Sequence, residues 1–144
     1  KRKILYNITY NAKQKEAIIA SLKENIVIIT GGPGTGKSTV IKGIVNGLIK
    51  LKGDEFIKED IALLAPTGRA SKRLAEVTKH HAQTIHKFLG YQGNGRFAAL
   101  TDGELKAKLI IIDEFSMVDI NLISIFFKCI SPEENKYPSA TACL

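Results

Sequence analysis

A glycine-rich loop joins a β-branched stretch to a segment of helical periodicity in the first third of the chain. Residues 26–30 read Ile-Val-Ile-Ile-Thr, and residues 31–39 read Gly-Gly-Pro-Gly-Thr-Gly-Lys-Ser-Thr. From Ser38 to Leu51, apolar residues recur near the 3.6-residue period of a helix. This order predicts a short buried strand, a loop and a helix whose N-terminus lies directly at the end of the loop.

The loop has the residue types that binding of a polyphosphate requires. Gly32, Gly34 and Gly36 lack a Cβ, so the backbone can take positive φ and bring its N–H groups close to phosphate oxygens. Lys37 can reach the β- and γ-phosphates, and the Ser38 hydroxyl can ligate Mg²⁺. The helix dipole favours the same anion. We therefore predict a P-loop for a nucleoside triphosphate, formed by Gly32, Pro33, Gly34, Thr35, Gly36, Lys37, Ser38 and Thr39.

Short apolar strands alternate with helices along the rest of the chain. We expect strands at 26–30, 61–65 and 108–112, helices at 10–24, 38–51, 69–78, 83–89 and 118–130, and a hairpin or flexible loop at 91–97. Continuous apolar strands between helices favour a parallel sheet covered on both faces, which is an α/β P-loop fold. We expect one lobe over residues 1–130 and a poorly ordered tail over 131–144, which has two prolines and no clear period.

Composition narrows the class of protein. The 144 residues suffice for about one domain, and no apolar run approaches the roughly 18 residues of a membrane span. Cys129, Cys143 and the three histidines have no metal-type spacing. We expect a cytoplasmic protein without a membrane partner. The formal charge of +7 favours an anionic polymer as partner, or else a basic surface that maintains solubility.

Two adjacent carboxylates follow the apolar strand at 108–112. The carboxyl ends of parallel strands meet at one edge of a sheet, so Asp113 and Glu114 should lie near the glycine loop. We predict that Asp113 holds the Mg²⁺ that Ser38 also ligates, and that Glu114 is the general base for the attacking water. The alternative is that Asp-Glu is the solvated start of a helix.

Five ordered segments resemble the motifs of superfamily 1 DNA helicases of the RecD type, which include the exodeoxyribonuclease V alpha subunit. They span nearly the whole chain from Tyr10 to Asp119, and they are Tyr-Asn-Ala-Lys-Gln-Lys-Glu-Ala at 10–17, the P-loop, Ala-Pro-Thr-Gly-Arg-Ala-Ser at 65–71, Thr-Ile-His-Lys-Phe-Leu-Gly at 84–90 and Asp-Glu-Phe-Ser-Met-Val-Asp at 113–119. Five motifs in order are more specific than the P-loop alone. The resemblance implies a RecA-like sheet that represents the first motor lobe only.

The resemblance also implies a role for Gln14. In such helicases the matching glutamine hydrogen-bonds the adenine edge, which would make ATP the nucleotide. Asn11 and Gln14 also have capping-box spacing, so Gln14 has the alternative role of closing a helix start.

Four further residues match motifs that hold single-stranded DNA. Thr67 and Arg69 follow the second apolar strand, where a hydroxyl, backbone N–H groups and basic charge can meet a phosphate. The alternative is an ordinary helix cap with a solvated basic face. Thr84 and His86 match a second such motif, where an imidazole can stack on a base. The alternative for His86 is packing on a short helix.

Later helicase motifs do not appear in this sequence. A Gly-Asp-x-x-Gln segment and an arginine finger on a second lobe are expected from the resemblance, but Ser-Pro-Glu-Glu-Asn-Lys-Tyr-Pro follows residue 130. Loss of an arginine finger typically lowers hydrolysis by about 10³- to 10⁵-fold. We expect the ATP-binding lobe of a 5′-to-3′ DNA helicase with nuclease or helicase partner subunits, itself weak in hydrolysis. The alternatives are another P-loop ATPase of DNA replication or transposition, and a non-catalytic nucleic-acid-binding remnant.

Overall fold

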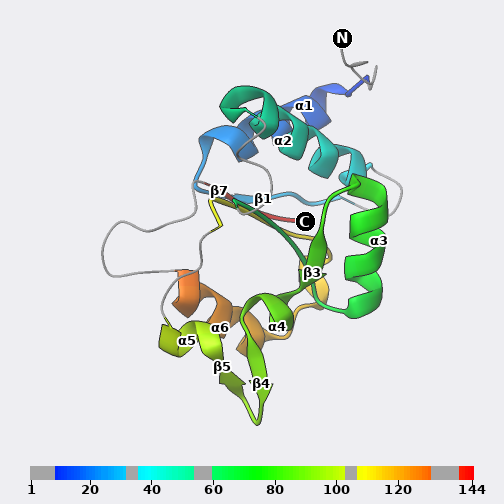
Figure 1. Ribbon diagram of the computed structural model, residues 1–144. Coiled ribbons are helices and arrows are strands. Elements are labelled where there is room, and N and C mark those ends of the chain that lie inside the picture. The colour runs from blue at the N-terminus through cyan, green and yellow to red at the C-terminus, as the bar shows by residue number, and fades with distance from the viewer. Residues whose placement is uncertain (1–8, 32–35, 54–59, 103–106, 131–139) are drawn as a thin grey trace.

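A five-stranded parallel sheet organises the chain, with helices on both of its faces (Figure 1). The computed structural model describes residues 9–31, 36–53, 60–102, 107–130 and 140–144. The strand order is β1-β7-β6-β2-β3, and a separate antiparallel hairpin pairs β4 with β5. In chain order the elements are α1 (Ala12–Lys23), β1 (Ile26–Ile28), α2 (Lys37–Lys52), β2 (Ile61–Ala65), α3 (Gly68–Thr78), β3 (Ala82–Thr84), α4 (Ile85–Phe88), β4 (Tyr91–Gly93), β5 (Arg96–Phe97), α5 (Ala98–Asp102), β6 (Leu109–Ile112), the 3-10 helix η2 (Phe115–Met117), α6 (Ile120–Ile130) and β7 (Ala140–Cys143).

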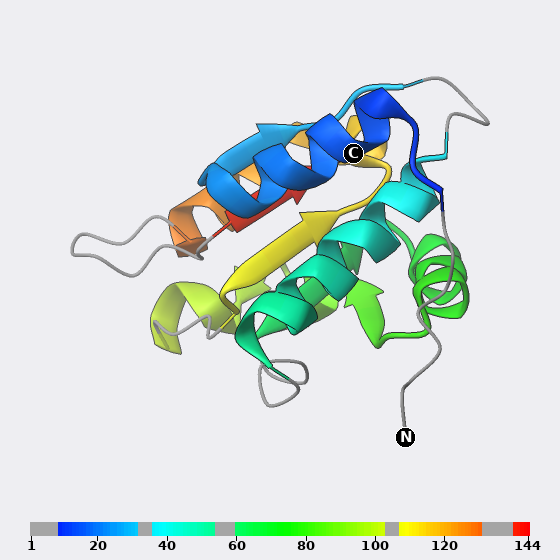
Figure 2. The same ribbon diagram turned by 90° about the horizontal axis from the view of Figure 1, so that it is seen from above.

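The two central strands β2 and β6 bury opposite faces in two cores. Leu63, Leu109 and Ile111 pack toward α2 and α3, with α1 beside α2 on the same face, whereas Leu64 and Ile110 pack toward α4 and α6. Adjacent residues on a strand point to opposite faces, so a continuous apolar run fills both cores. Figure 2 shows α1 and α2 lying along the same face of the sheet. The predicted α/β architecture is therefore confirmed.

Helix α2 approaches α1 closely because glycine lies at their contact. Gly43 is buried, and a Cβ built on it would collide with the end of the Ile18 side chain and lie 3.2 Å from the Tyr10 hydroxyl. At Gly47 the corresponding Cβ would lie 3.2 Å from Leu22. The two helices can pack at this distance only where a side chain is missing.

Two segments differ from the sequence-based expectation. Residues 83 and 84, expected as the start of the helix at 83–89, belong to strand β3, which pairs with β2 in the register Leu63↔Ala82 to Ala65↔Thr84. Residues 140–143, expected in a poorly ordered tail, form β7 between β1 and β6. Both strands are short and lack large apolar residues, so their pairing partners rather than their own propensity decide their structure. Residues 131–139 lie outside the described residues.

Candidate functional site

The carboxyl ends of the parallel strands bring the predicted site residues to one edge of the sheet. The loop to α2 follows β1, Asp113 and Glu114 follow β6, Thr67 follows β2, and Thr84 ends β3. Parallel sheets commonly bind ligands at this edge, because the loops there converge. The residues predicted to bind nucleotide and those predicted to bind single-stranded DNA thus lie on neighbouring loops of one surface.

The N-terminus of α2 is open to an anion. Gly36 precedes it in the left-handed conformation (φ 80°), as predicted for the last glycine of the loop. No side chain of the described residues caps this end, and its first turn carries Lys37, Ser38 and Thr39 but no acidic residue. Uncapped N–H groups and the helix dipole favour phosphate there. Gly32, Pro33, Gly34 and Thr35 lie outside the described residues.

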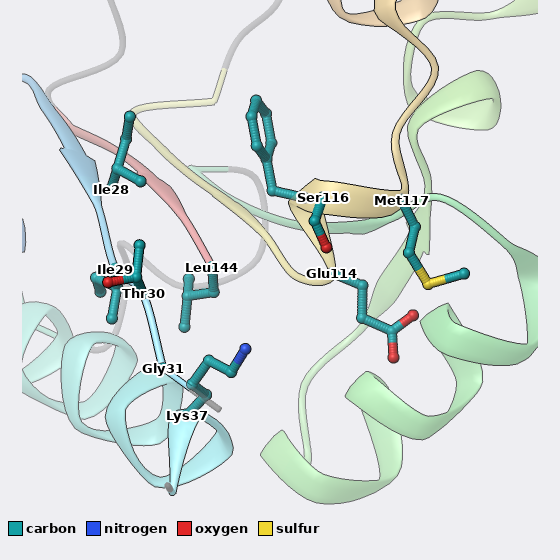
Figure 3. Close-up of a pocket in the computed structure, with 10 residues that line it drawn as sticks. Ile28, Ile29, Thr30, Gly31, Lys37, Glu114, Ser116, Met117 and Leu144 are labelled. Atoms are coloured by element: carbon teal, nitrogen blue, oxygen red, sulfur yellow. The ribbon is translucent and has the colours of Figure 1, made fainter. Parts of the chain in front are cut away.

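A cavity of about 370 Å³ lies beside this helix N-terminus. Its wall includes the segment from Ile28 to Gly31, Lys37, the turn from Glu114 to Met117, and Leu144. Figure 3 shows the Lys37 ammonium and the Glu114 carboxylate extending into this region from α2 and from the turn after β6. Among the described residues, the cavity therefore presents one cation and one carboxylate from elements that are far apart in the sequence.

The turn after β6 fixes the two carboxylates in different settings. The Asp113 N–H donates to the Leu64 carbonyl (2.9 Å), and the Glu114 N–H donates to Asp113 Oδ1 (3.0 Å). Glu114 has left-handed backbone angles (φ 52°, ψ 41°), and the Phe115 N–H donates to the Leu144 carbonyl (2.7 Å). Glu114 is the N-cap residue of η2, but its side chain makes no capping hydrogen bond there. Its carboxylate is therefore available to the cavity.

Both predicted catalytic residues line that cavity, whereas the two predicted Mg²⁺ ligands do not. Among the described residues, Lys37 and Glu114 form part of its wall, whereas Ser38 and Asp113 do not. Asp113 is half-buried, and only its Oδ1 has an assigned hydrogen bond, so Oδ2 retains its lone pairs. An oxygen ligand set of this kind suits a hard divalent cation, and Ser38 and Asp113 would hold Mg²⁺. A cation bound there would neutralise charge on a transferring phosphate.

Gln14 forms the capping box that its spacing predicts. Its Oε1 accepts from the Asn11 N–H (3.0 Å), and its own N–H donates to Asn11 Oδ1 (2.8 Å). A Cβ built on Gly36 would lie 2.5 Å from Gln14 Nε2, so the amide lies against the end of the glycine loop. The Nε2 hydrogens and one Oε1 lone pair remain available. Capping and contact with a nucleotide base are therefore compatible.

Two of the four residues predicted to hold single-stranded DNA, Thr67 and Thr84, also act as helix caps. The Thr67 hydroxyl accepts from the Ala70 N–H (3.2 Å), and the Thr84 hydroxyl accepts from the Lys87 N–H (3.1 Å). Each hydroxyl keeps its proton, which can be donated to a phosphate oxygen. Arg69 is exposed in the first turn of α3, and exposed His86 contacts the Tyr91 ring (centroids 5.2 Å apart). The two helix caps and the contact between the His86 and Tyr91 rings are present. The contacts of these residues with single-stranded DNA stay a prediction.

The titratable groups with shifted pKa values lie outside the cavity wall. Burial lowers the pKa of His80, on the loop between α3 and β3, and burial raises the pKa of the Cys129 thiol on α6. Within the described ranges, no three His, Cys, Asp or Glu residues are grouped closely enough to hold a metal ion. No helix in the described part of the chain is long and apolar enough to cross a membrane.

Some functional positions were missed by sequence reasoning. Leu144 lines the cavity and accepts the Phe115 N–H only because β7 enters the sheet beside β6. Ile28 and Met117 also belong to the cavity wall. Their sequence signals are those of ordinary apolar residues, so no pattern in the sequence separates them from the core.

A glycine loop that ends on an open helix N-terminus, at the carboxyl edge of a parallel sheet, is the architecture of a P-loop nucleotide-binding domain. Comparison with known proteins defines the family more narrowly. Residues 14–137 match the AAA domain family, and the chain belongs to it.

Relatives and a structural neighbour agree with this assignment. The chain is 32% identical over 139 residues to the RecBCD enzyme subunit RecD of Mycobacterium tuberculosis, over 83% of this chain and 24% of that subunit. It is 38% identical over 108 residues to the ATP-dependent RecD2 DNA helicase of Deinococcus radiodurans, over 74% of this chain and 14% of that helicase. The chain therefore spans a quarter or less of the length of these relatives. The resemblance to RecD-type helicases is confirmed.

The crystal structure of the Pif1 helicase from Candida albicans has a similar fold. Its TM-score to this chain is 0.64 at 24% identity, and the match covers 94% of this chain and 32% of that helicase. At this identity the likeness supports the fold alone.

Proposed function

We propose that this chain is the ATP-binding lobe of a 5′-to-3′ DNA helicase motor that binds Mg-ATP and single-stranded DNA. The observation that carries the proposal is the shared cavity of Lys37 and Glu114 beside the open N-terminus of α2. The homology to RecD and RecD2 supports the choice of motor class. RecD is a subunit of the RecBCD enzyme, which supports nuclease or helicase subunits as partners.

Each residue has a defined part in this proposal. The ammonium of Lys37 binds the β- and γ-phosphates, and the first N–H groups of α2 donate hydrogen bonds to the same anion. The Glu114 carboxylate orients the attacking water and takes its proton. The side-chain amide of Gln14 forms hydrogen bonds with the adenine edge. Thr67, Arg69, Thr84 and His86 hold the backbone and bases of the strand along the loops after β2 and β3.

The lobe alone is expected to hydrolyse ATP weakly. A helicase cycle needs two lobes that close on ATP and open after hydrolysis, so that the grip on the strand alternates. The chain spans only 24% of RecD and 14% of RecD2, which leaves room in such proteins for a second lobe.

Equilibrium binding of a fluorescent ATP analogue to this chain tests the nucleotide site. Lys37→Ala should weaken binding by about 10-fold or more, because charge-assisted bonds to phosphate are worth about 1.5–3 kcal/mol. Lys42→Ala, on the same helix, is the matched control and should bind as the unaltered chain does. Equal affinities of the unaltered chain and Lys37→Ala would contradict the proposed site.

The strand contacts need a separate test. Alanine at Thr67, Arg69, Thr84 and His86 should lower affinity for single-stranded DNA and leave ATP affinity unchanged. If strand binding is unaffected, a different P-loop ATPase of replication or transposition becomes the better account. If binding of single-stranded DNA persists and is affected neither by ATP nor by Lys37→Ala, a non-catalytic nucleic-acid-binding module is the better account of this chain.

A further inference from the structure

Tyr10 precedes α1 and lies against the middle of α2. Its side chain is half-buried, and a Cβ built on Gly43 would lie 3.2 Å from the Tyr10 hydroxyl. Gly43 is itself buried, and Figure 2 shows α1 and α2 lying along the same face of the sheet. The hydroxyl therefore fits on α2 because residue 43 has no side chain.

The contact of Tyr10 is additional to the packing of α1 on α2. Within α1, Ile18 already lies against Gly43, and Leu22 lies against Gly47. These two side chains join the helices along the length of α1. Tyr10 therefore acts on the segment in front of α1 rather than on the helix itself.

The backbone of Tyr10 is joined directly to the group that holds Gln14. The Asn11 N–H, which donates to Gln14 Oε1 (3.0 Å), belongs to the peptide unit that links Tyr10 to Asn11. Because a peptide unit is planar and rigid, the place of the Tyr10 Cα constrains the direction of this N–H. A side chain that anchors Tyr10 on α2 thus helps to fix the donor that Gln14 uses.

The bond from the Asn11 N–H determines which way the Gln14 amide faces. An N–H pairs with the oxygen of an amide and not with its NH₂, so Oε1 lies toward Asn11 and Nε2 lies against Gly36. The last side-chain torsion of a glutamine is otherwise broad, and an unbonded amide can turn over. The second capping bond, from the Gln14 N–H to Asn11 Oδ1, involves only the Gln14 backbone and does not set this torsion.

An amide held in one orientation can distinguish the two purine nucleotides. Adenine carries an amino donor and the N7 acceptor, which match the oxygen and the NH₂ of one amide. Guanine carries the acceptor O6 in place of the amino group. An amide that turns freely can present its NH₂ to O6 instead, and it then discriminates less between the two bases.

We propose that Tyr10 is a positioning residue for base recognition. Its contact with α2 at Gly43 fixes the peptide N–H that orients the Gln14 amide, and this orientation sets the preference for ATP over GTP. Tyr10 acts through Gln14 and does not itself contact the nucleotide. The inference rests on the proposed function, since it takes Gln14 as the residue that meets the base.

Competition of ATP, GTP and tripolyphosphate with a fluorescent ATP analogue tests the inference. Tyr10→Ala should lower the ATP-to-GTP affinity ratio by about 3- to 10-fold, which is part of the roughly 5- to 150-fold discrimination that one bidentate contact with a base gives. Tyr10→Phe keeps the ring and should keep most of the ratio. Tripolyphosphate has no base and should bind Tyr10→Ala as tightly as the unaltered chain. A weaker affinity for tripolyphosphate would show general damage to the glycine loop and would overturn the positioning role.

The same contact can be disturbed from α2. Gly43→Ala places a methyl group against the Tyr10 hydroxyl and should lower the ratio, and a second change, Tyr10→Phe, removes the hydroxyl and should restore part of it. Gly47→Ala adds the same methyl beside Leu22 and is the matched control, with no expected change in the ratio. A Gly43→Ala effect that Tyr10→Phe does not relieve would pass through Ile18 and would overturn the role of Tyr10.

Nuclear magnetic resonance relaxation of the Gln14 side-chain NH₂ gives a measurement without nucleotide. The amide should be ordered in the unaltered chain and more mobile in Tyr10→Ala, because the N–H that holds Oε1 is no longer fixed. Equal order in the two proteins would overturn the inference.

The outcomes separate this inference from the proposed function. If the unaltered chain prefers ATP over GTP and Tyr10→Ala prefers it equally, the positioning role is overturned and the proposed nucleotide site stands. If the unaltered chain binds tripolyphosphate but does not discriminate between ATP and GTP, the proposed adenine contact of Gln14 fails, and the role of Tyr10 fails with it.

Discussion

Glu114 is held in a backbone conformation that glutamate seldom adopts, at the position where its carboxylate meets the cavity. Its φ is 52°, and the adjacent Phe115 N–H is bonded to Leu144 across the sheet. A left-handed conformation costs a residue with a Cβ about 1–2 kcal/mol, and such strain concentrates at functional sites. The cost is consistent with a side chain placed for chemistry rather than for stability.

We predict that Glu114→Gly raises the free energy of unfolding by up to about 1 kcal/mol while nucleotide hydrolysis is lost in any protein that contains this lobe. Urea denaturation and an ATPase assay measure the two effects. Lys79→Gly is the matched control, because Lys79 also has positive φ (60°) but ends α3, outside the cavity wall. It should gain similar stability without loss of hydrolysis. A Glu114→Gly variant that is less stable than the unaltered chain would refute the strain argument.

Asn11 and Gln14 belong together, since the capping box fixes the amide that lies against Gly36. We predict that Asn11→Ala lowers stability by about 1 kcal/mol through loss of the cap. The same change should reduce the preference for ATP over GTP, because the helix start that carries Gln14 loses the bond from the Gln14 N–H to Asn11 Oδ1 and frays, although the residue 11 N–H that bonds Gln14 Oε1 is kept. Competition binding with the two nucleotides measures the preference, and Asn11→Asp, which keeps a capping oxygen, should retain most of it. A loss of stability with an unchanged preference would leave Gln14 with the capping role alone.

At the scale of elements, the packing of α1 on α2 depends on Gly43. We predict that Gly43→Ala is about 1–2 kcal/mol less stable than Gly47→Ala, because the added methyl meets Ile18 and Tyr10 at the first position but only the end of Leu22 at the second. Both variants gain the same helix propensity, so their difference isolates the packing effect. Thermal or urea unfolding of the pair gives the result. Equal stabilities would show that α1 moves freely on α2.

Elements with a strong apolar signal were predictable, and those defined by their neighbours were not. Strand β2 was expected over 61–65 and has those bounds, since its buried apolar residues fill two cores at once. Strand β3 has the sequence Ala-Gln-Thr, which gives no strand pattern, and it forms because β2 offers a parallel partner. Strand β7 likewise pairs on both sides. Pairing across the sheet depends on residues distant in the sequence, which local patterns do not report.

The same distinction holds at the site. The glycine loop and the carboxylates after β6 were predictable, because residue type and strand order together determine their place at one sheet edge. The contribution of Leu144 was not, since it arises from the pairing of β7 with β6, two segments that the sequence does not link. Site residues within one contiguous motif could therefore be predicted from the sequence more readily than site residues that the fold brings together.

For the whole molecule, β1 forms an edge of the sheet and leaves apolar surface open. Ile26 and Ile28 are 59% and 69% exposed, and Met117 on the neighbouring turn is 67% exposed. Exposed apolar residues on an edge strand are unusual for a protein that acts alone. This surface beside the nucleotide cavity agrees with the proposal that the lobe works within a larger protein.

ATP hydrolysis stimulated by single-stranded DNA decides whether this chain is the ATP-binding lobe of a helicase motor. The rate would be measured for this chain beside the longest available protein that contains it, each with a Glu114→Gln variant. We expect that only the longer protein hydrolyses ATP appreciably, that single-stranded DNA stimulates it, and that Glu114→Gln abolishes the activity. If neither protein hydrolyses ATP although both bind single-stranded DNA, the lobe is not part of a helicase motor.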